Sequence, residues 1–598
     1  MDEIANSSTF TPPSAVGSAE QPFQTLVESF ETIGRTLEGL SGWQIFFSII
    51  ILSITYDQCR YIWNKGSIVG PSLKIPFMGP FLESVNPKFS QYLAKWNSGP
   101  LSCVSVFHKF VVIASTRDLA RKVFNSPGYV SPCVVDVAKK ILRPDNWVFL
   151  DGRAHVEYRK GLNGLFSRQA IGMYLPGQEE IYDAYFKRWL GLSKEGKPIP
   201  FMSEFRDINC AVSLRTFVGH YISDEAVKEI SENYYKITAA LELVNFPIIL
   251  PWTKTWYGKK CADFVLNEFA ACAAKSRIAM KEGKEPGCTM DSWIKSMIEA
   301  KESDAAKIAA AKGLPQIREF SDMEISMTIF TFLFASQDAS SSATTWQFQI
   351  MADRPDIMKK IREEQLRVRD GDPHKKLDPD LVDKMVYTRA VVKEQLRYRP
   401  PVIMVPYEVK KSFQITPEYR VPKGAMVVPT LYPALHDPEV YNDPDSFVPE
   451  RWLEGGEAEA AKKNWLVFGA GPHVCLGQNY AIMNFMSMIG KASLMMDWEH
   501  HATPKSEDIK VFATIFPEVC FPMLLQEQHR TNLIFRMIVS WCSRSVIHTL
   551  PRNYLSLCPP PPISLTFTPP LQSFQGFFLF LPLNYKPFPS SLAGGCCI

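Results

Sequence analysis

The sequence predicts a mainly helical protein with a small β region and an N-terminal membrane anchor. Three observations support this fold class. Residues 318–353 form the longest run with helical signals, the apolar stretch Ala481–Met496 indicates a second long helix, and β-type patterns are confined to residues 103–115 and a short run near 427–429. The chain has 598 residues, of which 46% are hydrophobic and 21% charged, so it is long enough to bury a large core.

Charge and cysteine content narrow the class further. The net charge is only +3 and no dense basic block is present, so nothing in the sequence favours a nucleic acid as partner. The thirteen cysteines form no C-x-x-C pair, and their odd number argues against a disulfide framework. We therefore expect the main domain on the reducing, cytosolic side of any membrane.

The N-terminal region divides into a leader and an anchor. Residues 1–40 carry many Ser, Thr and Glu side chains and are predicted to be a disordered leader. Residues 41–65 are predicted to be a membrane anchor, because Ile45–Ile54 contains no charge and Trp43 and Tyr56 flank it. Basic residues follow the apolar run, so the positive-inside rule keeps the main domain cytosolic. A buried core helix is the alternative interpretation.

The rest of the chain divides into a connector, a main domain and a tail. The segment 70–80 is rich in Pro and Gly, which predicts a stiff connector that holds the main domain at a fixed angle to the anchor. The β-rich string at 103–115 predicts a hairpin. The main domain is expected over 66–524. Residues 525–598 contain ten prolines and six charged residues, which predicts an irregular tail that is disordered or an artefact of gene prediction.

One cysteine has the surroundings expected of an iron ligand. Cys475 lies in the glycine-punctuated segment 468–477, just before the predicted helix at 481–496. A thiolate that binds iron must be anionic, rigidly held and shielded. Gly469 and Gly477 allow tight turns, close approach of a flat macrocycle and amide hydrogen bonds to sulfur, while Phe468 would cover the sulfur. A structural cysteine in a Gly/Pro loop is the alternative.

The spacing Phe-x-x-Gly-x-x-x-Cys-x-Gly resembles the haem-binding signature of the cytochromes P-450. This resemblance implies a haem b cofactor whose iron is held by Cys475. The family usually has Arg two residues before the cysteine, where it reaches a haem propionate. This chain has His473, which donates a hydrogen bond but lacks the permanent charge.

Residues 151–160 resemble the family's helix with the pattern Trp-x-x-x-Arg. His155 takes the Trp position and Arg159 the Arg position. An i, i+4 pair lies on one helical face, so both side chains are expected to reach one propionate. A plain amphipathic surface helix is the alternative.

The long helix at 318–353 is apolar nearly all round at 327–335 and then becomes polar, which predicts a central buried helix with a functional turn. This turn resembles the family's oxygen-binding motif, to which Asp338 and Ser340 conform. Ala339 replaces the threonine that usually helps to deliver protons. The resemblance implies that Asp338 relays protons, with Ser340, a neighbouring serine or an ordered water as the hydroxyl. Capping or a helix–helix contact is the alternative.

Two further features follow from the resemblance. The predicted helix at 380–398 contains Glu394 and Arg397, which together with Arg451 match the family's buried charge network. An apolar substrate pocket is expected from the following residues: Phe330, Phe334, Ala335, Val402, Ile403 and Met404.

The segments 334–340 and 471–475 together resemble the fungal sterol C-22 desaturases of ergosterol synthesis. This finer resemblance implies an enzyme of the endoplasmic reticulum membrane that uses O₂ to remove one hydrogen each from C-22 and C-23 of a sterol. The electrons would come from NADPH through NADPH-cytochrome P-450 reductase. The alternatives are another sterol-oxidising monooxygenase, either a hydroxylase or a 14-demethylase, and a haem-thiolate sensor or carrier without turnover.

Overall fold

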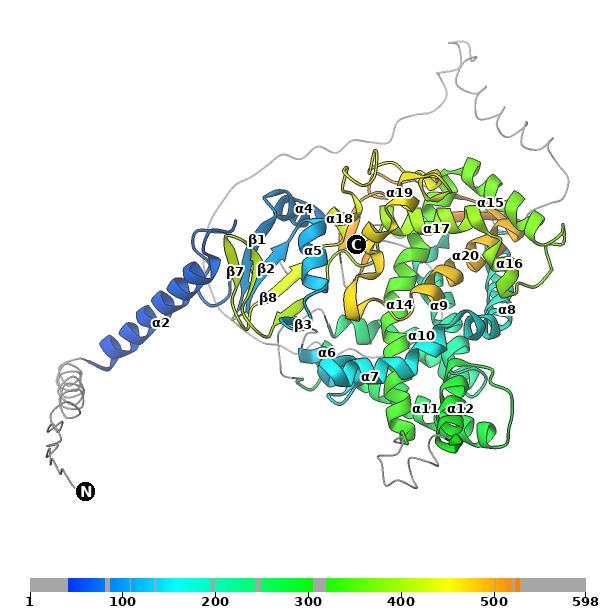
Figure 1. The fold of residues 1–598 in the computed structure, drawn as a ribbon, viewed down its shortest axis with the longest axis horizontal. Coiled ribbons are helices and arrows are strands. Elements are labelled where there is room, and N and C mark those ends of the chain that lie inside the picture. Colours follow the sequence, from blue (N-terminus) through cyan, green and yellow to red (C-terminus); the bar gives the residue numbers. More distant parts are fainter. Residues whose placement is uncertain are drawn as a thin grey trace, which may run out of the picture. The chain divides into compact units, whose positions relative to one another are not determined.

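A computed structural model gives the fold of this protein (Figure 1). It describes residues 41–527 except 81–86, 108, 134–135, 195–198, 242–248, 305–318, 501, 512–513 and 519–521. The predicted leader and nearly all of the predicted tail therefore lie outside the described residues. The predicted end of the main domain at residue 524 is too early, because strand β12, Pro522–Glu527, continues past it and pairs Leu525 with Trp498.

The described part is mainly helical, as the sequence predicts. Its longer helices are α2 (Gly42–Lys65), α4 (Phe89–Asn97), α5 (Arg117–Phe124), α7 (Gly152–Asn163), α8 (Arg168–Ser193), α9 (Phe201–Phe217), α10 (Asp224–Ala239), α11 (Lys254–Lys281), α12 (Thr289–Glu302), α14 (Asp322–Asp353), α15 (Pro355–Val368), α17 (Val386–Tyr398) and α20 (Gln478–Met495). Shorter ones are α6 (Asp136–Leu142), α16 (Pro379–Asp383), α18 (Tyr432–Leu435) and α19 (Glu457–Ala460).

Helix α14 runs through the middle of the helical part (Figure 1). The Ser321 hydroxyl accepts from the Glu324 amide and the Glu324 carboxylate accepts from the Ser321 amide, so a capping box starts the helix. It ends before Arg354-Pro355, since proline cannot continue a helical hydrogen-bond ladder. Helices α9 and α11 pack along it, and most of its residues are buried. The prediction of a central buried helix is confirmed.

The largest sheet has the strand order β1-β2-β8-β5-β3. Strands β1 (Leu101–Val106) and β2 (Lys109–Ala114) pair antiparallel, which confirms the predicted hairpin, and β8 (Met426–Pro429) pairs parallel with β2. The remaining strands are β3 (Val130–Pro132), β4 (Ile199–Pro200), β5 (Tyr407–Val409), β6 (Phe413–Thr416), β7 (Tyr419–Val421), β9 (Met496–His500), β10 (Ile509–Val511), β11 (Ile515–Pro517) and β12. Apart from β3 and β5, which belong to the largest sheet, these strands form a β4-β12-β9 sheet and the pairs β10-β11 and β6-β7.

The single helix predicted for residues 380–398 is wrong, because the structure divides it into α16 and α17. The break has a tertiary cause. The Glu364 carboxylate, from α15, accepts hydrogen bonds from the amides of Tyr387 and Thr388, so it caps α17 from outside. A capping side chain from another helix leaves no signal in the local pattern.

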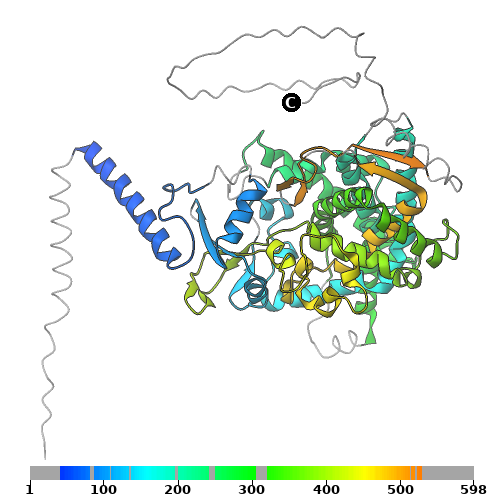
Figure 2. The same cartoon turned by 90° about the horizontal axis from the view of Figure 1, so that it is seen from above.

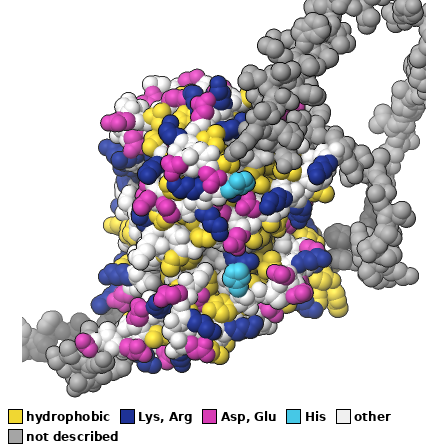
Figure 3. Space-filling view, turned by 90° about the vertical axis from the view of Figure 1, so that its right-hand side faces the viewer, with side chains coloured by type: hydrophobic (Ala, Val, Ile, Leu, Met, Phe, Trp, Pro, Cys, Tyr) yellow, Lys and Arg dark blue, Asp and Glu magenta, His cyan; other side chains and the backbone are white. Residues whose placement is uncertain are grey.

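Helix α2 has 24 residues and, among the described residues, is the one helix long and apolar enough to cross a membrane. Most of its apolar side chains, such as Phe47 and Ile51, are exposed. Both ribbon views show it projecting from the part of the molecule that carries β1 and β2 (Figures 1 and 2). The face shown in Figure 3 carries basic and acidic side chains interspersed with apolar ones, without a continuous field of one sign.

Candidate active site

The loop around Cys475 has a backbone shape that depends on glycine. Gly471 has a φ of +73°, and a Cβ there would lie 2.4 Å from the Phe124 carbonyl oxygen. The Cys475 amide donates to the Phe468 carbonyl at 3.0 Å, which closes the loop. By contrast, a Cβ on Gly469 or on Gly477 would meet nothing within 4 Å. The loop is therefore packed firmly on one side and open on the other.

The Cys475 thiol lies between protein and open space. Protein atoms crowd it, and this burial raises its pKa, while a hydrogen bond from the Gly477 amide and the charge of Arg159 act in the opposite direction. The residue nevertheless keeps exposed surface. A partly exposed thiol with an amide donor and a nearby cation is suited to bind a metal from its open side.

Helix α7 brings its predicted pair to this loop. Arg159 donates a hydrogen bond to the Val474 carbonyl, 315 positions away in the sequence. His155 is buried and stacks on the ring of His473, with ring centroids 4.1 Å apart and planes inclined by 30°. All three predicted donors therefore lie together beside Cys475.

Burial favours the neutral form of the two stacked imidazoles. Burial lowers the pKa of His155, and burial with the neighbouring His155 lowers that of His473 to about 4. Trp147 stacks against His155 at 6.3 Å, and its buried indole N–H has no hydrogen-bond acceptor among the described residues. The site thus combines the Arg159 guanidinium with neutral N–H donors, one of which lacks an acceptor.

Several side chains in the middle of α14, at the predicted polar turn, are exposed to solvent. This helix is otherwise buried, yet Ala335 is exposed and its neighbours Phe334, Ser336, Asp338 and Ala339 keep partial exposure. Exposed surface on a helix surrounded by other helices indicates a hollow beside that turn. Ser340 faces the interior and is buried.

Asp338 has two partners that sequence reasoning missed. Arg206, from α9, donates to its Oδ1 at 2.7 Å, and Thr238, from α10, donates to its Oδ2 at 2.8 Å. The ion pair is mostly shielded, with 22% of the Arg206 side chain and 13% of the Asp338 side chain exposed. No sequence signal links these residues, because Thr238 lies 100 positions before Asp338. The carboxylate is therefore fixed by two neighbouring helices.

The residues expected to line a substrate pocket fall into two groups. Phe334, Ala335, Val402 and Met404 keep exposed surface. Phe330 and Ile403 are instead buried within hydrophobic core clusters. The first group can face a ligand, while the second supports the wall from behind.

The predicted charge network is present in full. Arg397 binds both oxygens of Glu394 at 2.9 Å, and Arg451 Nε donates to Glu394 Oε1 at 3.0 Å. The indole N–H of Trp452, not predicted, donates to Glu394 Oε2 at 2.8 Å. At most 3% of any of the three charged side chains is exposed. This network ties α17 to the turn that precedes the Cys475 loop.

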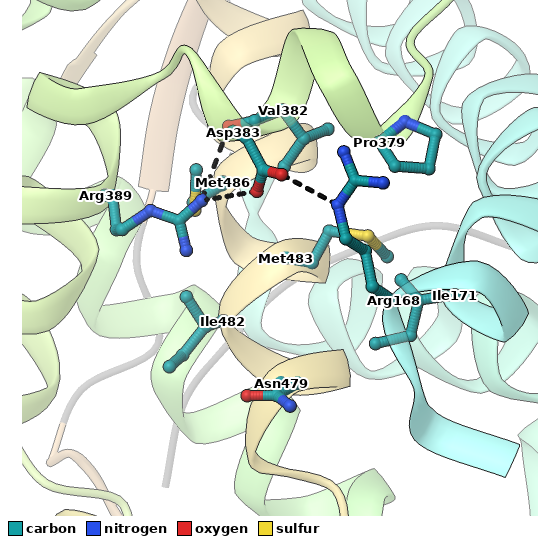
Figure 4. A pocket seen from close by; sticks show the side chains of 10 residues that line it. All are labelled: Arg168, Ile171, Pro379, Val382, Asp383, Arg389, Asn479, Ile482, Met483 and Met486. Carbon is teal, nitrogen blue, oxygen red and sulfur yellow. Dashed lines mark hydrogen bonds and ion pairs between the residues drawn. The ribbon is translucent and has the colours of Figure 1, made fainter. Parts of the chain in front are cut away.

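A pocket of about 230 Å³ lies beside α20 and contains none of the predicted site residues (Figure 4). Met483 and Met486 contribute to its apolar lining. Asp383 lies between Arg168 and Arg389 at its rim, at 2.8 and 3.4 Å. Its lining includes no residue of α14.

The fold and the donor set around Cys475 fit a protein that binds haem iron through a thiolate. The sequence profile described as Cytochrome P450 matches residues 69–518, and the chain belongs to the cytochrome P450 family. The predicted resemblance is thereby confirmed. Proteins of this family use a haem iron that receives electrons from a reductase, and this chain has the donor set for it: a thiol, open space beside Gly469 and Gly477, and N–H donors for the carboxylates.

Particular relatives are much more similar than the family in general. The C-22 sterol desaturase ERG5A of Gibberella zeae is 58% identical over 533 residues, which cover 88% of this chain and 99% of that protein. The C-22 sterol desaturase erg5 of Aspergillus fumigatus is 61% identical over 507 residues, or 83% of this chain and 96% of that protein. The solved structure of retinoic acid-bound cyanobacterial CYP120A1 has a TM-score of 0.65 and 21% identity, covering 76% of this chain and 98% of its own. At this level of identity, the similarity to CYP120A1 shows a shared fold and nothing further.

Proposed function

We propose that this protein is a sterol C-22 desaturase that introduces a C-22(23) double bond into the sterol side chain in ergosterol biosynthesis. The observation that carries the proposal is the identity of 58–61% with C-22 sterol desaturases of two fungi over most of both chains. The reaction removes one hydrogen each from C-22 and C-23, consumes O₂ and two electrons from NADPH, and releases water.

Cys475 holds the iron, and Phe468, Gly469 and Gly477 shape the loop around its sulfur. The bound haem supplies the oxygen activation that no side chain can provide. The Gly477 amide stabilises the thiolate, since it donates a hydrogen bond to the sulfur. The protein's part is to keep this sulfur anionic and rigid.

Arg159, His155 and His473 bind the haem carboxylates. Arg159 supplies the permanent positive charge, and the two imidazoles supply N–H donors. The indole N–H of Trp147, which has no acceptor in the described part of the chain, supports this assignment, because burying an unsatisfied donor is costly and a carboxylate would satisfy it. We therefore add Trp147 to the carboxylate-binding set.

Apolar side chains around the site orient the substrate. Phe334, Ala335, Val402 and Met404 face the sterol side chain, while Phe330 and Ile403 support them from the core. To desaturate rather than hydroxylate, the site must hold both C-22 and C-23 in reach, so that the second hydrogen leaves before a hydroxyl forms.

Asp338 relays protons to the site, and Ser340, another serine or a water replaces the hydroxyl missing at Ala339. Arg206 and Thr238 position its carboxylate. Asp338→Asn keeps the shape and the Thr238 contact but removes the acid, so we expect roughly a 10²-fold lower rate of sterol product per haem. Asp353→Asn, an exposed acid at the end of the same helix, is the control and should retain the rate.

Residues 1–40 are a leader, α2 anchors the protein in the endoplasmic reticulum membrane, the main domain lies in the cytosol, and the residues after the last strand form a tail. The electron donor is NADPH-cytochrome P-450 reductase. The apolar surface of α2 supports the anchor. The Glu394, Arg397 and Arg451 network stabilises the fold beneath the Cys475 loop and so supports haem incorporation.

Microsomes that contain this protein and the reductase should convert a C-22-saturated sterol with NADPH into a product two mass units lighter. Gas chromatography with mass spectrometry reads this change directly. A stable side-chain alcohol as the sole product, or loss of the 14-methyl group, would refute C-22 desaturation. Haem spectra without any NADPH-dependent product would favour a sensor or carrier.

A further inference from the structure

The hairpin formed by β10 and β11 packs against the polar turn of α14. Its two strands pair antiparallel, and Thr514 directly precedes β11. The Ile515 carbonyl accepts hydrogen bonds from the Ser342 hydroxyl and from the Trp346 indole N–H, the latter at 3.2 Å. The Ile515 amide donates to the Pro401 carbonyl at 3.0 Å. The start of β11 is therefore held both by α14 and by the segment that follows α17.

These contacts place Thr514 beside Ala339, where the sequence lacks the expected threonine. Spacings of four, three and four residues return a helix to the same side, so one face of α14 carries Ala335, Ala339, Ser342 and Trp346. The first two of these keep exposed surface, and the last two bind the start of β11. Thr514 thus enters the site from outside the helix, next to its exposed face.

The hydroxyl of Thr514 reaches the polar turn itself. Its Oγ1 lies 3.5 Å from the backbone carbonyl oxygen of Asp338, the residue before Ala339. This is a long distance for a hydrogen bond between oxygens, so the carbonyl holds the hydroxyl only weakly and lets it rotate. The residue is buried, with 6% of its surface exposed. A rotating hydroxyl that both donates and accepts is suited to pass protons.

The serines that follow Ala339 in α14 are less well placed. Each residue turns a helix by about 100°, so Ser340 and Ser341 point about 100° and 160° away from Ala339. The Ser341 hydroxyl donates at 2.6 Å to a carbonyl one turn back in its own helix. Ser342 shares the face of Ala339, but its hydroxyl donates to β11. The structure therefore favours Thr514 over these three serines.

We propose that Thr514 supplies the hydroxyl that α14 lacks at Ala339 and passes protons from Asp338 to the exposed face of the helix. The inference rests on the proposed proton relay through Asp338 and names the hydroxyl within it. In each transfer the Thr514 oxygen accepts one proton from Asp338 through an ordered water and releases its own hydroxyl proton on the other side. The threonine ends unchanged, and Asp338 regains a proton from solvent water.

Removal of the hydroxyl with little change of shape tests this role. The full chain with bound haem and its reductase is incubated in nanodiscs with a C-22-saturated sterol, and sterol product, NADPH and hydrogen peroxide are measured together. We expect Thr514→Val to form about tenfold less product per NADPH, less than the effect of a lost acid because water partly takes over, with peroxide in its place. Thr514→Ser keeps the hydroxyl and should stay within about twofold of the wild type. The solvent deuterium isotope effect on product formation should rise in Thr514→Val.

Thr345→Val is the matched control, because it makes the same substitution at another buried threonine. Its hydroxyl donates at 2.7 Å to the Ser341 carbonyl, one turn back in α14. This variant should form as much product per NADPH as the wild type. The reduced carbon monoxide spectrum confirms that each variant is folded, and the sterol-induced change in the haem spectrum gives its sterol affinity. We expect Thr514→Val to bind the sterol as tightly as the wild type.

A second substitution distinguishes a relay from a packing role. Ala339→Thr places a hydroxyl on α14 itself, and the exposed surface of Ala339 indicates room for the larger side chain. When it is combined with Thr514→Val, we expect product per NADPH to return to within about twofold of the wild type. A defect in hairpin packing or in a sterol contact at position 514 would persist in this double variant.

The outcomes separate the relay from the hydroxyl assigned to it. Wild-type product per NADPH in Thr514→Val, or a loss that Ala339→Thr does not restore, would overturn the assignment. Several-fold weaker sterol binding as the sole defect would also overturn it, because Thr514 would then be a substrate contact. Unchanged product per NADPH in Asp338→Asn would instead refute the proposed relay, and absence of desaturated sterol from the wild type would refute the proposed function.

Discussion

Glu394 is the residue whose loss we expect to damage the fold most. Its carboxylate accepts hydrogen bonds from Arg397 Nε and Nη2, Arg451 Nε, the Trp452 indole and the Val448 amide, all between 2.8 and 3.0 Å. None of its surface is exposed. Glu394→Gln keeps the shape of the side chain but replaces an oxygen that accepts with an NH₂ group that cannot.

The cost follows from the charges that remain. Arg397 and Arg451 are still buried, with 0% and 3% of their side chains exposed, but no longer have a carboxylate between them. Breaking a buried ion pair from one side costs about 3–5 kcal/mol, because a charge is left uncompensated. We expect a loss of this size in the free energy of unfolding. It is a large fraction of the 5–15 kcal/mol typical of folded proteins.

Urea denaturation of the haem-loaded chain, followed by tryptophan fluorescence, measures this loss. The matched control is Glu450→Gln, in the same turn as Arg451. Glu450 binds Lys360 at 2.7 Å, but 45% of its side chain is exposed, so its loss should cost less than about 1 kcal/mol. If Glu394→Gln were no more destabilising than this control, the reasoning about the buried network would be wrong.

Two further predictions concern the Cys475 loop and the free energy of unfolding at acidic pH. Gly471→Ala should lower the haem content per protein, measured from the reduced carbon monoxide spectrum, because its Cβ would clash with Phe124. The control is Gly455→Ala, which has a similar φ of +80° but free space around its Cβ and should retain haem. An equal loss of haem in both variants would exclude the clash as the cause. Burial lowers the pKa of His436 to about 3, so the unfolded state binds more protons below pH 6.5 and stability falls as the pH drops towards 3. His436→Phe, which preserves the stack on Tyr432, should reduce the loss of unfolding free energy between pH 6.5 and 5 by roughly 1.5 kcal/mol; an unchanged loss in urea titrations would contradict this.

Local signals in the sequence predicted the features that depend on neighbouring residues. The hydrophobic run and the terminal Pro355 identified α14, and β-rich residues identified the β1–β2 hairpin. The glycines and the cysteine of the loop at 468–477 sit within ten residues, so their spacing alone indicated the ligand site. Periodicity and turn chemistry act over a few residues, and a single sequence displays them directly.

Long-range packing decided the rest. The parallel pairing of β8 with β2, the cap that Glu364 places on α17 and the contacts of Arg206 and Thr238 with Asp338 all join distant parts of the chain. Local patterns do not separate Phe330, which is buried in the core, from Phe334, which keeps exposed surface, since both are apolar residues on one helix.

The sequence by itself determined the helical class, the apolar helix near the N-terminus and the glycine-punctuated cysteine loop, and resemblance to a family identified the members of the charged network. The tertiary structure alone decided that His155 and His473 stack, that Asp338 is held between two other helices, and that the connector lies against the sheet. The physical reason is that helix formation and tight turns depend on neighbouring residues, whereas side-chain partners depend on the path of the whole chain.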